Sequence, residues 1–211
     1  MAGKPQEGGA ALARRGPAAA ESTQEAQLLY HHDASVIRLR PRHPNHIWSV
    51  DLVHDKLSNG RPYKMLTVLD EYTREALCVR VSVKMASADV LDALYPLFLQ
   101  RGKPTYIRSD NGPEFASATF QGWLRRVGVE PIRIYPGSPW ENGYNERFNG
   151  TLRTEVLNAE WFATTQQAQI VINTWMRQYN RIRPHQALGM RPPVPETLLE
   201  KAQITGPDTG G

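Results

Sequence analysis

Three acidic residues have types and spacing that suit a metal-dependent catalytic site: Asp51, Asp110 and Glu146. The second and third acids are separated by 35 residues. Mg²⁺ prefers hard oxygen ligands and usually takes only a few carboxylates from a protein. Two such ions about 4 Å apart can hold the attacking and leaving oxygens of a phosphodiester. The pattern therefore favours phosphoryl transfer, and the competing interpretation is that these are ordinary surface acids among the 21 in the chain.

Alternating apolar residues predict the strands that would position the first two acids. Five runs have this alternation: 47–53, 63–69, 76–83, 105–109 and 130–135. The first three runs are separated only by turns, so we expect an antiparallel trio. Asp51 falls mid-strand on the side opposite Trp48, Val50 and Leu52. An unpaired carboxylate there is costly unless it binds a metal or a partner, whereas Asp110 follows the end of a strand, a common position for sites.

Helical spacing of apolar residues predicts the remaining elements. Residues 87–100 form one expected helix, which Pro96 should kink or shorten, and residues 114–127 form another. Glu146 lies in a third helical stretch. The residues that share its face at helical spacing are Asn142, Asn149 and Arg153. A later apolar stripe predicts the packing of a C-terminal helix through Ala168, Val171, Ile172, Trp175 and Tyr179.

Other acids and histidines are interpreted as structural. The acids predicted near turns or strand ends are Asp55, Asp70, Glu71 and Glu75. Glu114 opens a helix, where a carboxylate interacts favourably with the helix dipole. We expect His185 to cap or pack the last helix rather than to bind metal.

Composition excludes several classes of protein. The single cysteine, Cys78, cannot form an intramolecular disulfide and alternates with apolar neighbours, so it is expected to be buried filler. No apolar run approaches the roughly 20 residues of a membrane span. The net charge of +4 is divided between the two ends, because residues 47–160 hold 14 basic and 14 acidic side chains. Since DNA affinity comes largely from neutralising phosphates, a neutral core should bind DNA weakly.

The segments around the three acids resemble the catalytic reading frame of orfB-type insertion-sequence transposases, whose core is shared with retroviral integrases. The similar segments are 46–51 (HIWSVD), 109–115 (SDNGPEF) and 139–150 (PWENGYNERFNG), and the resemblance runs from about His46 to Leu199. It implies a ribonuclease-H-like α/β fold with a mixed five-stranded sheet flanked by helices. The family has a catalytic Asp-Asp-Glu set with the same 35-residue gap and a basic residue seven positions after the Glu, here Arg153.

The resemblance implies a DDE-type transposase that uses one or two Mg²⁺ or Mn²⁺ ions held by Asp51, Asp110 and Glu146. Water would first cleave a strand at the transposon end, and the exposed 3′-hydroxyl would then attack another phosphodiester. The candidate DNA contacts are Arg153, Asn142, Asn149 and Trp140, the last as a base-stacking residue in a Pro/Gly-rich loop. The expected partners are transposon-end and target DNA and further copies of the chain, in the bacterial cytoplasm and at the nucleoid when bound.

We divide the chain into a disordered N-terminal segment (1–26), an extended lead-in (27–45), the catalytic core (46–160), a helical C-terminal extension (161–200) and a disordered tail (201–211). Full-length members of the family carry helix-turn-helix modules before the core, made partly by an upstream reading frame. Residues 1–45 have no clear pair of amphipathic helices. We therefore expect either a truncated copy or dependence on an upstream-frame helix-turn-helix protein.

Two other functions remain open from the sequence. A ribonuclease-H-like nuclease would share the fold but usually needs a fourth carboxylate. A remnant that binds DNA without catalysis could also retain the three acids. A strand-transfer assay separates these alternatives.

Overall fold

The computed structural model describes residues 39–134 and 142–194. The expected N-terminal segment (1–26), most of the lead-in, the tail (201–211) and Trp140 lie outside the described residues. The elements below belong to one unit that begins at Pro41. Among them, no helix is long and apolar enough to cross a membrane.

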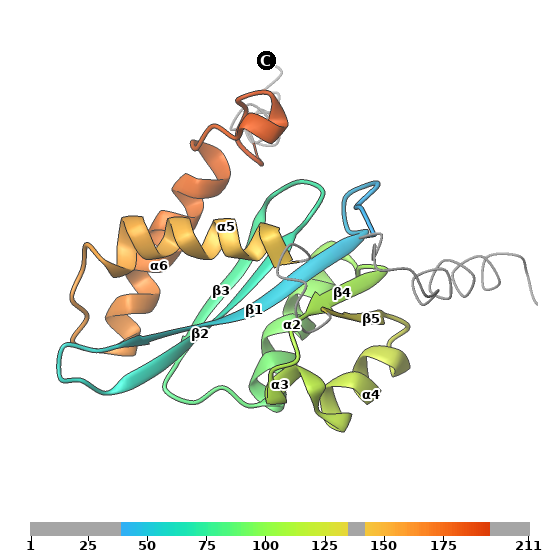
Figure 1. The fold of residues 1–211 in the computed structure, drawn as a ribbon, viewed down its shortest axis with the longest axis horizontal. Helices are drawn as coiled ribbons and strands as arrows, with labels where there is room; N and C mark the ends of the chain where they lie inside the picture. The colour runs from blue at the N-terminus through green and yellow to red at the C-terminus, as the bar shows by residue number, and fades with distance from the viewer. Residues whose placement is uncertain (1–38, 135–141, 195–211) are drawn as a thin grey trace, which may run out of the picture. The chain divides into compact units, whose positions relative to one another are not determined.

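Five strands form one mixed sheet in the order β3-β2-β1-β4-β5 (Figure 1). Their bounds are β1 Ile47–Lys56, β2 Pro62–Asp70, β3 Ala76–Ser82, β4 Tyr106–Ser109 and β5 Glu130–Arg133. β1, β2 and β3 pair antiparallel, which confirms the predicted trio. β4 runs parallel to β1, and β5 runs parallel to β4. Asp110 therefore follows the end of the strand beside β1.

Alternation along β1 divides its side chains between two apolar clusters. Trp48 and Val50 pack in the cluster that contains α2 (Ser87–Arg101), with Leu52 against it. Val53 packs in the cluster on the other face, which contains α6 (Thr165–Arg181). This division matches the two sides predicted for the strand, and it directs Asp51 to the α6 side of the sheet.

Helices cover both faces of the sheet (Figure 1). Beside α2, one face carries α3 (Pro113–Ala116) and α4 (Ala118–Arg126). The other carries α5 (Gly143–Leu152), the π-helical turn η2 (Arg153–Leu157) and α6. A short 3₁₀ turn, η3 (Gln186–Leu188), follows α6. The mixed five-stranded sheet flanked by helices is the architecture that the sequence predicted.

One helix prediction requires correction. The expected helix over 114–127 is two helices, because Ser117 is extended (φ −62°, ψ 145°) and its hydroxyl accepts a hydrogen bond from Phe120 N to cap α4. Apolar residues on both sides of this break still face one cluster, so their spacing does not reveal it. Pro96 does not shorten its helix, since α2 continues through it to Arg101.

Candidate active site

Asp51 is half-buried beneath α5 and is held by amides from that helix and its N-cap. Its Oδ2 accepts hydrogen bonds from Asn149 Nδ2 at 2.8 Å and from Asn142 Nδ2 at 3.4 Å. Its Oδ1 accepts from the backbone N of Leu52 at 2.8 Å. The helical face predicted from the spacing of Asn142, Glu146 and Asn149 therefore meets β1 at the first acid.

The pKa of Asp51 is raised from an ordinary value of 3.8 to about 6, mainly by burial and also by the negative charges of Asp110 and Glu146, against the opposing hydrogen bonds from Leu52 and Asn142. Asp110, at the end of β4, and Glu146, on α5, are thus each close enough to Asp51 to act on its carboxyl. Carboxylates in such a group cannot all ionise cheaply without a cation.

The backbone after β4 holds Asp110 in a tight turn. Its Oδ1 accepts a hydrogen bond from Gly112 N at 2.9 Å. A Cβ at position 112 would lie 3.0 Å from that same oxygen, so glycine permits the close approach. Asn111 Nδ2 donates to Ile134 O at 2.8 Å and ties the turn to the chain that follows β5. The neighbouring strand thus fixes where Asp110 lies.

Glu146 is exposed in the first turn of α5, where the helix dipole favours its negative charge. The residue before it, Asn145, is fully buried and accepts a hydrogen bond from Ser49 Oγ at 3.1 Å. Phe148 and Leu152 bury the same side of α5. These contacts press α5 against β1 and leave Glu146 on the rim of the site.

The donor set fits a hard divalent cation. Asp110 and Glu146 lie near enough to Asp51 to act on its carboxyl, and the Oδ1 atoms of Asn142 and Asn149 are buried without a hydrogen-bond partner among the described residues. These are oxygen ligands of the kind that Mg²⁺ takes. Among residues 39–134 and 142–194, however, no three His, Cys, Asp or Glu side chains lie close enough to hold one ion in this arrangement. A shared metal ion therefore stays a prediction.

The predicted DNA contacts have different positions. Asn142 and Asn149 donate to Asp51, and Arg153 Nη2 donates to the backbone O of His54 on β1 at 3.0 Å. Trp140 lies outside the described residues. Contact of these side chains with DNA remains a prediction.

A buried ion pair beside the site was not foreseen from the sequence. Arg108, on β4 two residues before Asp110, donates to both carboxylate oxygens of Glu71 at 2.6 and 2.7 Å, and each residue is 1% exposed. Asp70 and Glu75 are buried as well. Their positions near turns and strand ends predicted no special role for them. A charged residue inside the apolar strand 105–109 was the signal that a buried partner was needed.

Glu114 has the structural role expected of it. Burial alone would raise the pKa of Glu114, but the ammonium of Lys64, 2.5 Å from its Oε1, outweighs burial and lowers the pKa below its ordinary value. The pair joins the start of α3 to β2.

Two integrase core domain family models match the chain, over residues 41–139 and 127–193. The chain is 46% identical over 151 residues to the 39.2 kDa protein of insertion element IS476 from Xanthomonas euvesicatoria, covering 72% of this chain and 44% of that protein. It is 41% identical over 167 residues to the 31.7 kDa protein of insertion element IS407 from Burkholderia multivorans, covering 79% and 60%. The chain thus spans about half the length of these relatives.

Solved structures share the fold. The HTLV-2 integrase catalytic core domain in complex with magnesium aligns with a TM-score of 0.57 and 25% identity, over 72% of this chain and 96% of that one. The catalytic core domain of BIV integrase aligns with a TM-score of 0.55 and 18% identity, over 75% and 96%. The sheet and its helices are therefore ribonuclease-H-like, as the sequence predicted.

Proposed function

Because the chain belongs to the insertion-sequence transposases with an integrase-like core, we propose that it cleaves and joins DNA strands by metal-dependent phosphoryl transfer at Asp51, Asp110 and Glu146. The observation that carries this proposal is the raised pKa of Asp51, to which the charges of Asp110 and Glu146 contribute beside burial. Clustered acids with perturbed pKa values are typical of functional sites.

Asp51, Asp110 and Glu146 would hold one or two Mg²⁺ or Mn²⁺ ions. When bound, the metal supplies Lewis acidity and positive charge at the phosphodiester oxygens. Asn142 and Asn149 hold the Asp51 carboxylate in place through its Oδ2. Ser49 and Asn145 hold α5, and with it Glu146, against β1. The rigid strands position two of the acids, and the packed helix positions the third.

The reaction proceeds in two steps. In the first, water attacks a phosphodiester at the end of the element, so that one P–O bond forms, the bond to the 3′-oxygen breaks and a 3′-hydroxyl is released. In the second, that hydroxyl attacks a phosphodiester of the target strand, forming a new 3′-linkage and displacing the target's own 3′-oxygen. The chain acts as an oligomer on paired ends in the bacterial cytoplasm.

Labelled duplexes that carry the ends of the encoding element test this function directly. With Mg²⁺ the purified chain, alone or with an upstream-frame protein, should nick the end and join it to target DNA. Glu146→Gln should lower both rates on the order of 1,000-fold, because metal charge stabilisation is worth several kcal/mol and about 1.4 kcal/mol is tenfold.

The matched control is Glu160→Gln, since Glu160 is an exposed acid beyond η2. It should keep the rates of the unchanged chain. Normal cleavage by Glu146→Gln would show that Glu146 is not a residue of the catalytic site. Hydrolysis without joining would favour a nuclease, and specific binding without either step would favour a non-catalytic remnant.

A further inference from the structure

Two arginines lie against aromatic rings on the side of α5 that meets α6. The guanidinium carbon of Arg74, from the β2–β3 turn, lies 3.7 Å from the centroid of the Tyr144 ring on α5. Its Nη1 also donates to the backbone O of Glu71 at 2.5 Å. The guanidinium carbon of Arg183, just after α6, lies 5.9 Å from the Tyr179 ring centroid. Flat rings hold both cations in defined positions, which lowers the entropy lost when they bind a ligand.

A third arginine extends from α5 toward the same place. Arg147 follows Tyr144 by three residues, so the two share a side of the helix. The next residue, Phe148, packs edge-on against Tyr179 with ring centroids 4.9 Å apart. Arg147 is exposed, and among the described residues no hydrogen bond or ion pair engages its guanidinium. Its charge is therefore available to a ligand.

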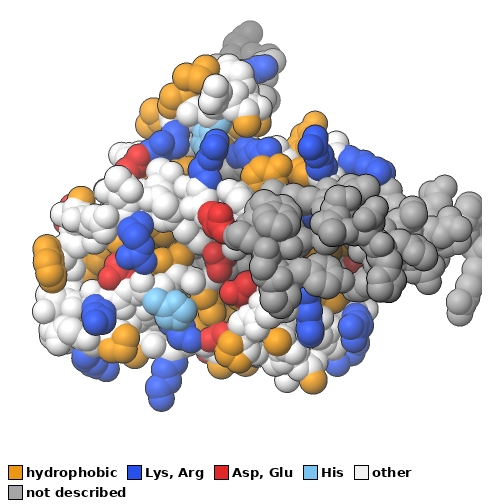
Figure 2. Space-filling view, in the orientation of Figure 1, with side chains coloured by type: hydrophobic (Ala, Val, Ile, Leu, Met, Phe, Trp, Pro, Cys, Tyr) orange, Lys and Arg blue, Asp and Glu red, His pale blue; other side chains and the backbone are white. Residues whose placement is uncertain are grey.

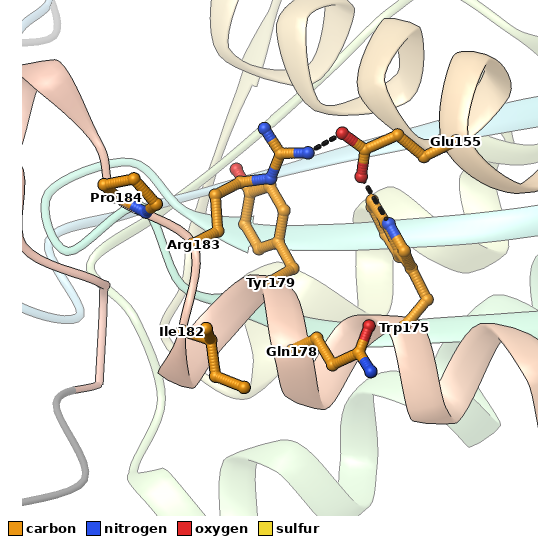
Figure 3. Close-up of a pocket in the computed structure, with 7 residues that line it drawn as sticks. All are labelled: Glu155, Trp175, Gln178, Tyr179, Ile182, Arg183 and Pro184. Carbon is orange, nitrogen blue, oxygen red and sulfur yellow. Dashed lines mark hydrogen bonds and ion pairs between the residues drawn. The ribbon is translucent and has the colours of Figure 1, made fainter.

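The surroundings leave this group of arginines with excess positive charge. Arg183 pairs with Glu155, which also accepts a hydrogen bond from Trp175 Nε1 at 2.8 Å (Figure 3). Within the described part of the chain, neither Arg74 nor Arg147 has a carboxylate within ion-pair distance. Figure 2 shows Lys and Arg side chains gathered above the acidic side chains on one face.

The three arginines change the pKa of His185, whose ring packs beside Tyr179. His185 lies edge-on to Tyr179, with centroids 4.9 Å apart, as expected for a packing residue. Burial lowers the pKa of His185, and the positive charges of Arg183, Arg74 and Arg147 lower it further. Arg74 and Arg147 also oppose the effect of burial, which raises the pKa of Tyr179 to about 12. The three guanidinium groups therefore lie near enough to the Tyr179 and His185 rings to act on one or both of them, and their like charges repel one another.

We propose that Arg74, Arg147 and Arg183 form a binding site for the backbone phosphates of duplex DNA, on the opposite side of α5 from the three acids. This site rests on the proposed function and names where the DNA lies. Guanidinium groups bind phosphate through paired, charge-assisted hydrogen bonds, and an approaching phosphate would relieve their repulsion.

The width of α5 sets the distance between the three acids and the three arginines, which are the two places where DNA would be held. A helix with its side chains is about 10–12 Å across, and phosphates of one strand recur about every 3.4 Å along the duplex axis. Glu146 and Arg147 are consecutive and point to different sides of α5. A strand with its reacting phosphate at the acids thus crosses α5 and presents a phosphate roughly three nucleotides away to the arginines.

The dependence of DNA affinity on salt tests this site. The full chain is titrated with a duplex of fixed arbitrary sequence from 50 to 200 mM salt without divalent metal, for the unchanged protein and for Arg147→Gln. Each phosphate contact contributes about 0.9 to the slope of log K against log salt. Arg147→Gln should lower the magnitude of this slope by about 0.9. Over the fourfold range of salt, the DNA affinity of the variant should then fall about 3.5-fold less than that of the unchanged protein.

Arg125→Gln is the matched control, because Arg125 is exposed on α4, which covers the other face of the sheet. It should leave the slope unchanged, and Arg74→Gln should lower it as Arg147→Gln does. An unchanged slope in both Arg147→Gln and Arg74→Gln would overturn the site. So would an equal decrease in Arg125→Gln, since binding would then follow total charge alone.

Failure of the proposed function has a different signature. Binding is measured without metal and needs no cleavage, so a lowered slope in Arg147→Gln supports the phosphate site even if the chain does not cleave DNA. Conversely, cleavage and joining by the unchanged chain with an unchanged slope in both Arg147→Gln and Arg74→Gln would support the function and reject this site.

Discussion

Asp51 occupies a place where its ionised form costs the folded chain free energy. Burial is the main cause, and the charges of Asp110 and Glu146 add to it. Two side-chain amides donate to the carboxylate and offset part of this cost. A residue kept in such a place is more easily explained by a bound cation than by folding stability.

The direction of the Asp51 pKa shift predicts how the stability of the folded chain depends on pH. The folded pKa of Asp51, about 6, lies above its ordinary value of 3.8. The folded state then binds the proton more tightly, so the stabilisation is present below pH 3.8 and is lost as pH rises through 6. In chelator, Asp51→Asn should gain up to about 3 kcal/mol over the unchanged chain between pH 4 and pH 8, since one pKa unit is about 1.4 kcal/mol.

Urea unfolding at a series of pH values measures this difference. Asp92→Asn, at an exposed acid on α2, is the control and should show no such trend. A stability difference between Asp51→Asn and the unchanged chain that stays constant from pH 4 to pH 8 would contradict the burial argument.

Sequence spacing identified the residues that share the helical face at Asp51, because a helix repeats regularly and Asn142, Glu146 and Asn149 follow that repeat. It did not identify the Glu71–Arg108 pair. These partners lie 37 residues apart, and Glu71 follows β2, which β1 separates from β4 in the sheet, so they meet only in the folded chain. Local patterns carry no information about such a contact.

At the scale of elements, α6 protects the free edge of the sheet. β3 is an edge strand, with unpaired backbone groups on its outer side. Gln169 accepts a hydrogen bond from Val81 N and donates to Val79 O, both at 2.7 Å. Asn180 likewise accepts from Ala76 N at 2.9 Å and donates to Ala76 O at 2.8 Å. Side-chain amides thus take the place of a neighbouring strand and prevent edge-to-edge pairing.

Gln169→Leu should therefore destabilise the chain by about 1–3 kcal/mol, because it leaves a partly buried donor and acceptor of β3 without their Gln169 partners. Chemical denaturation measures the loss, and light scattering should show association through the exposed edge. Gln166→Leu is the control, since Gln166 is an exposed residue of the same helix and should change stability by less than about 0.5 kcal/mol. Equal effects of the two substitutions would contradict an edge-protecting role.

The elements were predictable where side-chain patterns define them. Alternation located β1, β2 and β3, because each strand has residues directed to both clusters. The break between α3 and α4 was not predictable from apolar spacing, because Phe115 and Phe120 face the same cluster across it. The extended backbone of Ser117 causes the break between the two helices. A serine does not reveal this break, because serine is common in loops, caps and helices alike.

At the scale of the molecule, the sheet is enclosed by two apolar clusters that depend on each other. Leu94 of α2 packs in one cluster and Ile172 of α6 in the other, and both are fully buried. Each of β1, β2 and β3 contributes side chains to both clusters. Loss of packing on one face of the sheet therefore weakens the strands that support the packing on the other face. We expect residues 46–134 and 142–194 to unfold as one cooperative unit.

Ile172→Ala and Leu94→Ala test this cooperativity. Each should lower the free energy of unfolding by about 2–5 kcal/mol, the usual cost of such a cavity. In both variants, tryptophan fluorescence and far-ultraviolet circular dichroism should follow a single coincident transition. Ile170→Ala is the matched control on α6, because Ile170 is 63% exposed and should change stability by less than about 0.5 kcal/mol. An early separate transition in Ile172→Ala, with the sheet still folded, would show instead that α6 is a detachable element, and the edge of β3 would then be free whenever α6 unfolds.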